Sequence, residues 1–107
     1  MINGHFSEHW RTAGIPAGGV SSGRGFTISW QNGPLGVGTQ RREPNGAFVE
    51  DVIQAVISRI NEYQDSCFSC DENALALYHL RLAAEALDSR TTRRQAEAVE
   101  GTHRVGK

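Results

Sequence analysis

The sequence predicts an α+β protein in which a small N-terminal antiparallel β-sheet precedes a C-terminal antiparallel two-helix hairpin. Composition is the first reason, because ten of the twelve glycines and all three prolines lie in residues 1–46 and disfavour helix there. Periodicity is the second, because beyond residue 47 apolar residues recur three and four positions apart, as on one face of a helix. A chain of 107 residues buries only a limited core by itself, so an oligomer is expected.

The N-terminal residues 1–24 are expected to form a glycine-rich arm. Within and just beyond this stretch, residues 11–25 show almost no apolar periodicity, which is typical of a flexible loop or arm. The remaining residues, 25–107, are expected to form a single domain.

Strands are expected over about residues 25–42. Residues 25–31 alternate large apolar with small polar side chains, which is the pattern of a half-buried strand, and a turn signal follows at 32–34. One strand is not stable alone. This strand must therefore pair with residues 35–40 or with part of the N-terminal arm, within the protomer or across a subunit boundary.

Two helices follow. The first is predicted over 47–65, with two acidic residues in its first turn, where the helix dipole favours anions. Residues 66–70 connect it to a second helix over 71–89, which is expected to extend further and to end at Gly101.

The second helix carries two apolar stripes, and one antiparallel neighbour can bury only one of them. The other stripe therefore needs the strands or another subunit as a partner. The two stripes are Leu77, Leu80, Ala84 and Leu87, and Leu75, Tyr78, Leu82 and Ala86.

Charge is distributed unevenly along the chain, although the formal net charge is only −1. The net charge is +3 in residues 1–42, −7 in 43–88 and +3 in 89–107. This pattern is compatible with a local anion site but not with a broad nucleic-acid surface, so nucleic acid is not an expected partner. No stretch approaches the roughly 18 apolar residues of a membrane span, and no apolar signal core begins the chain, so a cytoplasmic protein without a membrane partner is expected.

An arginine cluster at 90, 93 and 94 predicts a phosphate site. Arg90 and Arg94 share one helix face, and a guanidinium group binds phosphate with a planar fork of donors. The alternative is that these cations only offset the dipole at the helix end.

The sequence Gly101-Thr102-His103 is expected to form a turn that folds back over these arginines. Its N–H groups and hydroxyl would bind phosphate, and its histidine would donate to phosphate or stack on a base. The alternative is a simple helix stop with a frayed tail.

Two more residues have a structural and a binding interpretation. Tyr63 continues the apolar face of the first helix, so it is either a core residue or a stacking platform for a base. Asn73 lies in the first turn of the second helix and is either a residue of the helix cap or a reader of a base edge.

The chain contains no Walker lysine motif, no G-x-S-x-G, no H-E-x-x-H and no paired acid and base, so neither catalysis nor a cofactor is expected. Cys67 and Cys70 have the C-x-x-C spacing of a zinc site, but such a site needs two more ligands. His79 and His103 are the candidates for that role. We interpret the cysteines instead as small, partly buried, reduced thiols and expect no metal.

Three segments resemble those of phage Thoeris anti-defence sponges, a family that shares a helical hairpin with phage anti-CBASS sponges. They are residues 45–53 (NGAFVEDVI), residues 70–76 (CDENALA), and Arg90-Thr91 through Val99-Glu100-Gly101-Thr102-His103. The resemblance covers roughly residues 25–105, and its last two segments are the specific ones.

This resemblance implies a non-enzymatic phage protein that binds and sequesters cyclic nucleotide signals in the cytoplasm of the infected bacterium. The implied ligand is a glycocyclic ADP-ribose isomer made by a TIR-domain enzyme, with cyclic di- or trinucleotides as further ligands in separate sites. The implied assembly is a homodimer, and a hexamer that gathers several such dimers is the larger alternative. A small oligomeric module that binds protein or nucleic acid is the competing function.

Carried over position by position, the family's ligand-binding residues fall on Tyr63, Asn73, Arg90, Gly101, Thr102 and His103. Arg94 is added from its spacing to Arg90 rather than from the resemblance. The family's N-terminal basic contacts align loosely with Arg24, Arg41 and Arg42.

Overall fold

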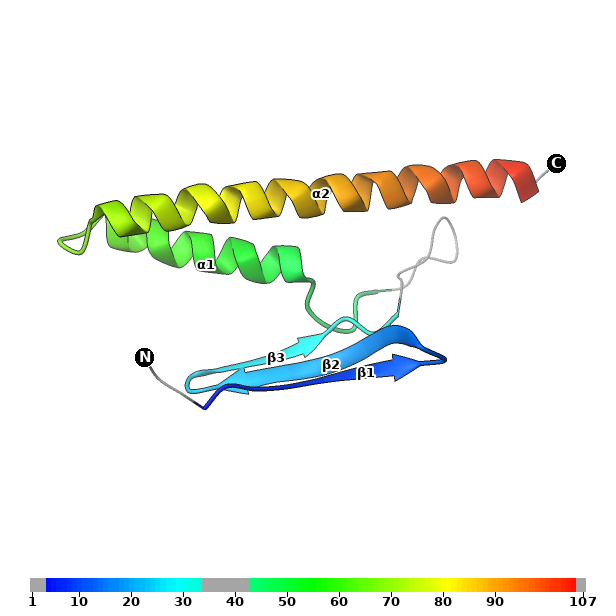
Figure 1. Ribbon diagram of the computed structural model, residues 1–107, viewed down its shortest axis with the longest axis horizontal. Helices are drawn as coiled ribbons and strands as arrows, with labels where there is room; N and C mark the ends of the chain where they lie inside the picture. The colour runs from blue at the N-terminus through cyan, green and yellow to red at the C-terminus, as the bar shows by residue number, and fades with distance from the viewer. Residues whose placement is uncertain (1–3, 34–42, 106–107) are drawn as a thin grey trace. The chain divides into compact units, whose positions relative to one another are not determined.

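The computed structural model describes residues 4–33 and 43–105, and the chain divides into two compact units, residues 1–49 and 50–107 (Figure 1). The first unit holds three antiparallel strands and the second holds a helical hairpin. The predicted α+β order, with a sheet followed by two helices, is therefore confirmed. Within the described ranges, no helix is both long and apolar enough to cross a membrane.

The sheet is a three-stranded meander in the order β1-β2-β3, formed by β1 (Phe6–Thr12), β2 (Ile15–Gly23) and β3 (Phe26–Trp30). Ala13 and Gly14 connect β1 to β2 with positive φ values of 53° and 79°. Two consecutive positive φ values are the signature of a type I′ turn, whose twist matches that of the flanking strands.

The expectation of a flexible loop over residues 11–25 is wrong, because β2 occupies most of this stretch. Its small residues give no apolar periodicity, yet they allow close approach of the neighbouring strand. A Cβ atom at Gly19 would lie 2.5 Å from the carbonyl oxygen of Glu8 on β1. The partner of β3 is thus a piece of the N-terminal arm, whereas residues 35–40, the other candidate, lie outside the described residues.

A clamp formed by Asn45 and Gly46 ties the chain that leaves the sheet back onto its edge. The Ala47 N–H donates to the Ser29 carbonyl at 2.7 Å, and the Asn45 side chain bonds both backbone groups of Asn32, at 2.8 and 3.0 Å. A Cβ atom at Gly46 would lie 2.6 Å from the carbonyl group of Trp30, so this position needs glycine.

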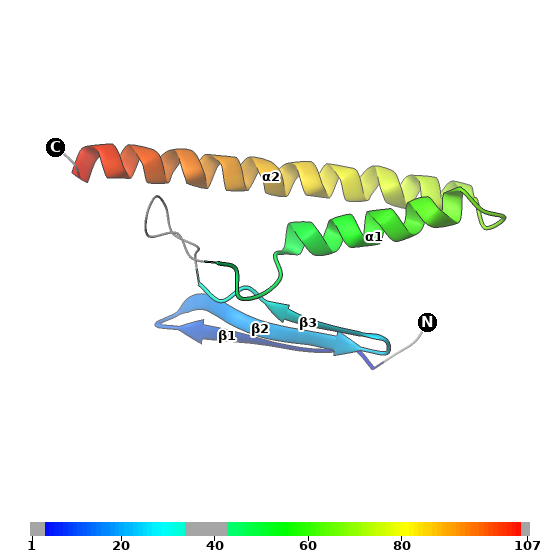
Figure 2. The same ribbon diagram turned by 180° about the vertical axis from the view of Figure 1, so that it is seen from behind.

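The hairpin consists of α1 (Val49–Gln64) and the longer α2 (Asp71–Val105), which lie side by side in both views (Figures 1 and 2). The first helix begins two residues later and ends one residue earlier than predicted. The second helix continues through Gly101, so the predicted stop at that residue is wrong. Its extension contains arginine, glutamine, alanine and glutamate, which are strong helix formers, and one glycine costs a helix only about 1 kcal/mol relative to alanine.

One apolar stripe of α2 supplies the core of the hairpin, and the other remains exposed. Leu77 and Ala84 are buried together with Ile57 of α1. The exposed fractions of the second stripe are 58% for Leu75, 59% for Tyr78 and 46% for Leu82. The single hairpin therefore covers one stripe of α2, and the large side chains of the other face outward.

Candidate functional site

Arg90 is held by an acidic residue of the other helix. Its Nη2 atom lies 3.6 Å from Oε1 of Glu50, in the first turn of α1. The Thr91 hydroxyl donates to the other carboxylate oxygen, Oε2, at 3.4 Å. No local sequence pattern predicts this pair, because Glu50 precedes Arg90 by forty positions.

The guanidinium group of Arg90 retains unused donors. Its Nε atom is buried and finds no hydrogen-bond acceptor among the described residues. The side chain as a whole is 40% exposed, so an acceptor from solution can reach its outer atoms. Because Nε and Nη2 form one edge of the guanidinium fork, an oxyanion bound there would satisfy the buried N–H group.

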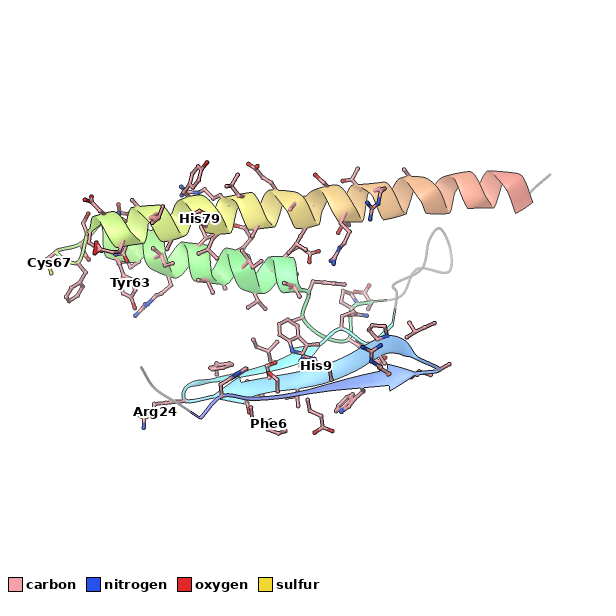
Figure 3. All side chains as sticks on the ribbon, in the orientation of Figure 1. Phe6, His9, Arg24, Tyr63, Cys67 and His79 are labelled. Atoms are coloured by element: carbon pink, nitrogen blue, oxygen red, sulfur yellow. The ribbon has the colours of Figure 1, made fainter. Side chains whose placement is uncertain are left out.

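Tyr63 lies near the end of α1, beside the loop that joins the helices, and it is 37% exposed rather than a core residue (Figure 3). The Arg59 guanidinium lies over its ring, with Cζ 5.2 Å from the ring centroid, and Nε donates to the phenol oxygen at 3.3 Å. Phe68 meets the same ring edge-on at 6.4 Å. The pKa of Arg59 is raised, first by its hydrogen bond to Tyr63 and then by electrostatic attraction to the phenol oxygen of Tyr63. The carboxylate of Glu62 adds a smaller effect in the same direction.

Arg59 and Phe68 are therefore neighbours of Tyr63 that our reading of the sequence missed. The spacing of Arg59 four residues before Tyr63 is a helical signal that could have revealed the first contact. Phe68 could not have been found in this way, because its position depends on the conformation of the connecting loop.

Asn73 serves the cap region of α2, which was one of its two predicted roles. Its Nδ2 group donates to the Phe68 carbonyl at 3.1 Å. The amide of Gln64 closes the same loop by bonding both the N–H and the C=O of Cys70, at 3.0 and 3.2 Å. The side-chain oxygen and the second Nδ2 hydrogen of Asn73 have no partner among the hydrogen bonds of the described residues, and reading of a base edge stays a prediction.

The two cysteines of the connecting loop, Cys67 and Cys70, are exposed, so their interpretation as partly buried thiols is wrong. His79 lies on α2 with its ring edge against Tyr78, 5.4 Å between centroids. Among the side chains that the structure describes, no group of three or more His, Cys, Asp or Glu residues is placed to hold a metal ion.

The predicted ligand residues are separated along the hairpin. Asn73 and Arg90 are seventeen positions apart on one continuous helix, which corresponds to about 25 Å. Arg90 and Thr102 are twelve positions apart on the same helix, about 18 Å. No single protomer can therefore bring Tyr63, Asn73 and Arg90 together in one small pocket.

The backbone of residues 101–103 is helical, so the predicted turn that folds back over the arginines is wrong. Arg94 follows Arg90 by one helical turn on the same face. Arg24 is an exposed residue of the turn between β2 and β3, and Arg41 and Arg42 lie outside the described residues.

Charges are segregated along the hairpin. The last turn of α1, the connecting loop and the first turn of α2 form an acidic tip with the residues Glu62, Asp65, Asp71 and Glu72. Residues 89–105 of α2 carry four arginines, at positions 90, 93, 94 and 104, against the two acids Glu97 and Glu100, so that their formal net charge is +2. The hairpin thus has an acidic end, with Tyr63 and Asn73, and a basic end, with Arg90.

Comparison with known proteins identifies the hairpin. The chain is 39% identical over 82 residues to "Thoeris anti-defense 1" of Bacillus phage SBSphiJ7, an alignment that covers 77% of this chain and 55% of the relative. The chain thus spans little more than half the length of this relative. The family "Acb2/Tad1, hairpin domain" matches residues 25–92, which include β3, α1 and the first part of α2. The chain belongs to the Acb2/Tad1 hairpin-domain family.

Proposed function

We propose that this protein is a phage anti-immune sponge, which binds and sequesters a cyclic nucleotide signal in the cytoplasm of the infected host without cleaving it. The observation that carries the proposal is the guanidinium fork of Arg90, which has a buried Nε without an acceptor among the described residues and outer atoms open to solution. Family membership and the phage anti-defence relative support the same function.

A glycocyclic ADP-ribose isomer is the proposed ligand, with cyclic di- or trinucleotides as further ligands. Such a molecule presents two phosphates and an adenine. Arg90 and Arg94 would bind phosphate, and Tyr63 would stack on the base. Asn73 would accept a hydrogen bond from the base edge, and the helical segment Gly101-Thr102-His103 would add further polar contacts.

The separation of these residues means that one ligand must be bound by two protomers. Antiparallel pairing of two hairpins would bring the acidic tip of one, with Tyr63 and Asn73, to the basic end of the other, with Arg90. The opposite charges of the two ends favour this orientation. The exposed stripe of Leu75, Tyr78 and Leu82 lies between the two ends of the hairpin and would be buried at the contact. A homodimer is thus the proposed binding unit, and a hexamer assembled from such dimers is the larger form.

A sponge must hold the signal below the threshold of its receptor, which requires nanomolar affinity or better, about −12 kcal/mol. Charge-assisted hydrogen bonds of about 1.5–3 kcal/mol each and stacking of about 1–3 kcal/mol per base can supply this free energy in an enclosed site. We expect such a complex to release its ligand slowly, because differences in affinity between related complexes lie mainly in the dissociation rate.

The test is calorimetry of the purified protein with the cyclic ADP-ribose isomer, followed by heating and mass analysis of the released ligand. We expect tight binding, one site per Tyr63–Arg90 pair, and recovery of the ligand chemically intact. Recovery of a cleaved product would make the protein an enzyme. Affinity for long DNA or RNA that falls steeply with salt, without binding of the cyclic nucleotide, would instead favour a nucleic-acid-binding module.

A further inference from the structure

Glu50 connects the start of α1 to two consecutive residues of α2. One carboxylate oxygen, Oε1, lies 3.6 Å from Arg90 Nη2, and the other, Oε2, accepts a hydrogen bond from the Thr91 hydroxyl at 3.4 Å. The Glu50 side chain is only 22% exposed, so it is confined between the helices. Its place in the first turn of α1 also suits a carboxylate, because the helix dipole favours negative charge there.

The contact leaves the ligand-facing part of Arg90 available. Glu50 approaches one nitrogen of the guanidinium group, Nη2, which carries two hydrogens. Nη2 has a second hydrogen and Nη1 carries two more, and the buried Nε atom has no acceptor among the described residues. A guanidinium group can therefore contact Glu50 and a phosphate at the same time.

We infer that Glu50 is a positioning residue that fixes the orientation of Arg90 before the ligand arrives, and that Thr91 in turn fixes Glu50. The inference rests on the proposed function, because it assigns Arg90 to a phosphate of the cyclic nucleotide. An arginine side chain free in solution samples many rotamers, and fixing it on binding costs affinity. Glu50 lowers that cost by restricting the guanidinium group in the unliganded protein.

The test compares variants in which the carboxylate is truncated, neutralised or moved out of contact. Glu50→Ala removes both contacts and should weaken binding of the cyclic ADP-ribose isomer about fivefold to tenfold. Glu50→Gln keeps an oxygen acceptor at the same place and should rescue affinity to within about twofold of the wild-type value. Asp51→Ala is the matched control, because it removes a charge from the same helical turn. Among the contacts that the structure describes, Asp51 has none with Arg90, so this variant should change affinity by less than about twofold.

A second readout does not depend on the ligand. The NMR signal of the Arg90 Nε–H group, assigned by its loss in Arg90→Lys, should report an immobile side chain in the wild type and in Asp51→Ala. In Glu50→Ala the same group should become mobile. Thr91→Val removes only the hydroxyl that holds Oε2, and it should give a smaller change in the same direction even if Glu50→Ala fails to fold.

The outcomes separate this inference from the proposed function. If the wild-type protein does not bind the cyclic nucleotide, the proposed function fails, whatever the NMR signal shows. If the wild type binds and Glu50→Ala binds equally well or more tightly, Glu50 competes with the ligand instead of positioning Arg90, and the inference is wrong. An Arg90 signal that is equally mobile in all variants would also overturn it.

Discussion

A binding site shared by two antiparallel hairpins predicts that two inactive variants will complement each other. Tyr63→Ala removes the base-stacking ring, and Arg90→Ala removes the phosphate fork. Each should abolish tight binding alone, by about 1–3 kcal/mol for the ring and about 2–4 kcal/mol for the guanidinium group. These losses correspond to about fivefold to nearly a thousandfold in the dissociation constant.

Mixing the two variants restores one of the two sites in each mixed dimer. The distance along α2 is the reason: Asn73, which like Tyr63 contacts Phe68, is about 25 Å from Arg90. In the proposed site, an intact Tyr63 therefore acts with the intact Arg90 of the other protomer. In a Tyr63→Ala/Arg90→Ala dimer both substitutions fall in one site, and the other site is of wild-type composition. Random exchange of subunits gives about half mixed dimers, so about a quarter of all sites should recover.

The assay is titration of the cyclic ADP-ribose isomer into the mixture after incubation long enough for subunit exchange. Exchange itself is verified by mass measurement of two protomers that carry different tags. The matched control mixes Tyr63→Ala with the double variant, a combination that cannot form an intact site. If the exchanged mixture shows no sites of wild-type affinity, the shared site is refuted.

The remaining predictions concern the sheet, the loop and the dimer surface. Ala13→Gly should raise the free energy of unfolding by about 0.5–1 kcal/mol in denaturant titrations, because Ala13 has a φ of +53° that alanine disfavours; no gain would refute the turn conformation. Gly46→Ala should lower stability by about 1–3 kcal/mol and accelerate amide exchange at Ala47, since the added Cβ would meet the Trp30 carbonyl at 2.6 Å. Gln64→Ala should cost about 1–2 kcal/mol, seen as faster exchange of the Cys70 amide, which Gln64 accepts at 3.0 Å. Leu82→Glu should leave the helical circular dichroism intact, because Leu82 is 46% exposed on a single hairpin. It should convert the proposed dimer to a monomer, as measured by light scattering, and weaken ligand binding. A variant that remains a stable dimer would show that this stripe is not the interface.

The hairpin was predictable because its signal is local. Apolar residues at spacings of three and four fix α1 to within two residues, and the exposed stripe of α2 follows from the same periodicity. By contrast, β2 was missed because Gly18, Gly19 and Ser21, its buried residues, carry no hydrophobic pattern. These residues are buried because β2 is the central strand, with β1 on one side and β3 on the other. The residues of β2 alone do not indicate that position.

The candidate site was only partly predictable. Arg90 and Tyr63 could be selected for their chemistry, and the predicted second helix already separates Asn73 from Arg90 by seventeen positions, whereas the expected stop at Gly101 concealed that residues 101–103 continue α2. Glu50 and Arg90 are neighbours only because the hairpin folds back in one register, and no local pattern encodes that contact. Gly101 is helical for a different reason. The preference of a single glycine for a helix end is weak, and the strong helix formers that precede it outweigh that preference.

The Asn45–Gly46 clamp has a consequence for how this chain tolerates change. Because it joins residues 31–32 to 45–47 through hydrogen bonds, the ends of the intervening segment are fixed whatever sequence lies between them. In general, doubling the number of residues between two such fixed ends costs only about 0.6 kcal/mol in chain entropy. We therefore expect that a peptide can be grafted between residues 33 and 44 without changing the register of β3.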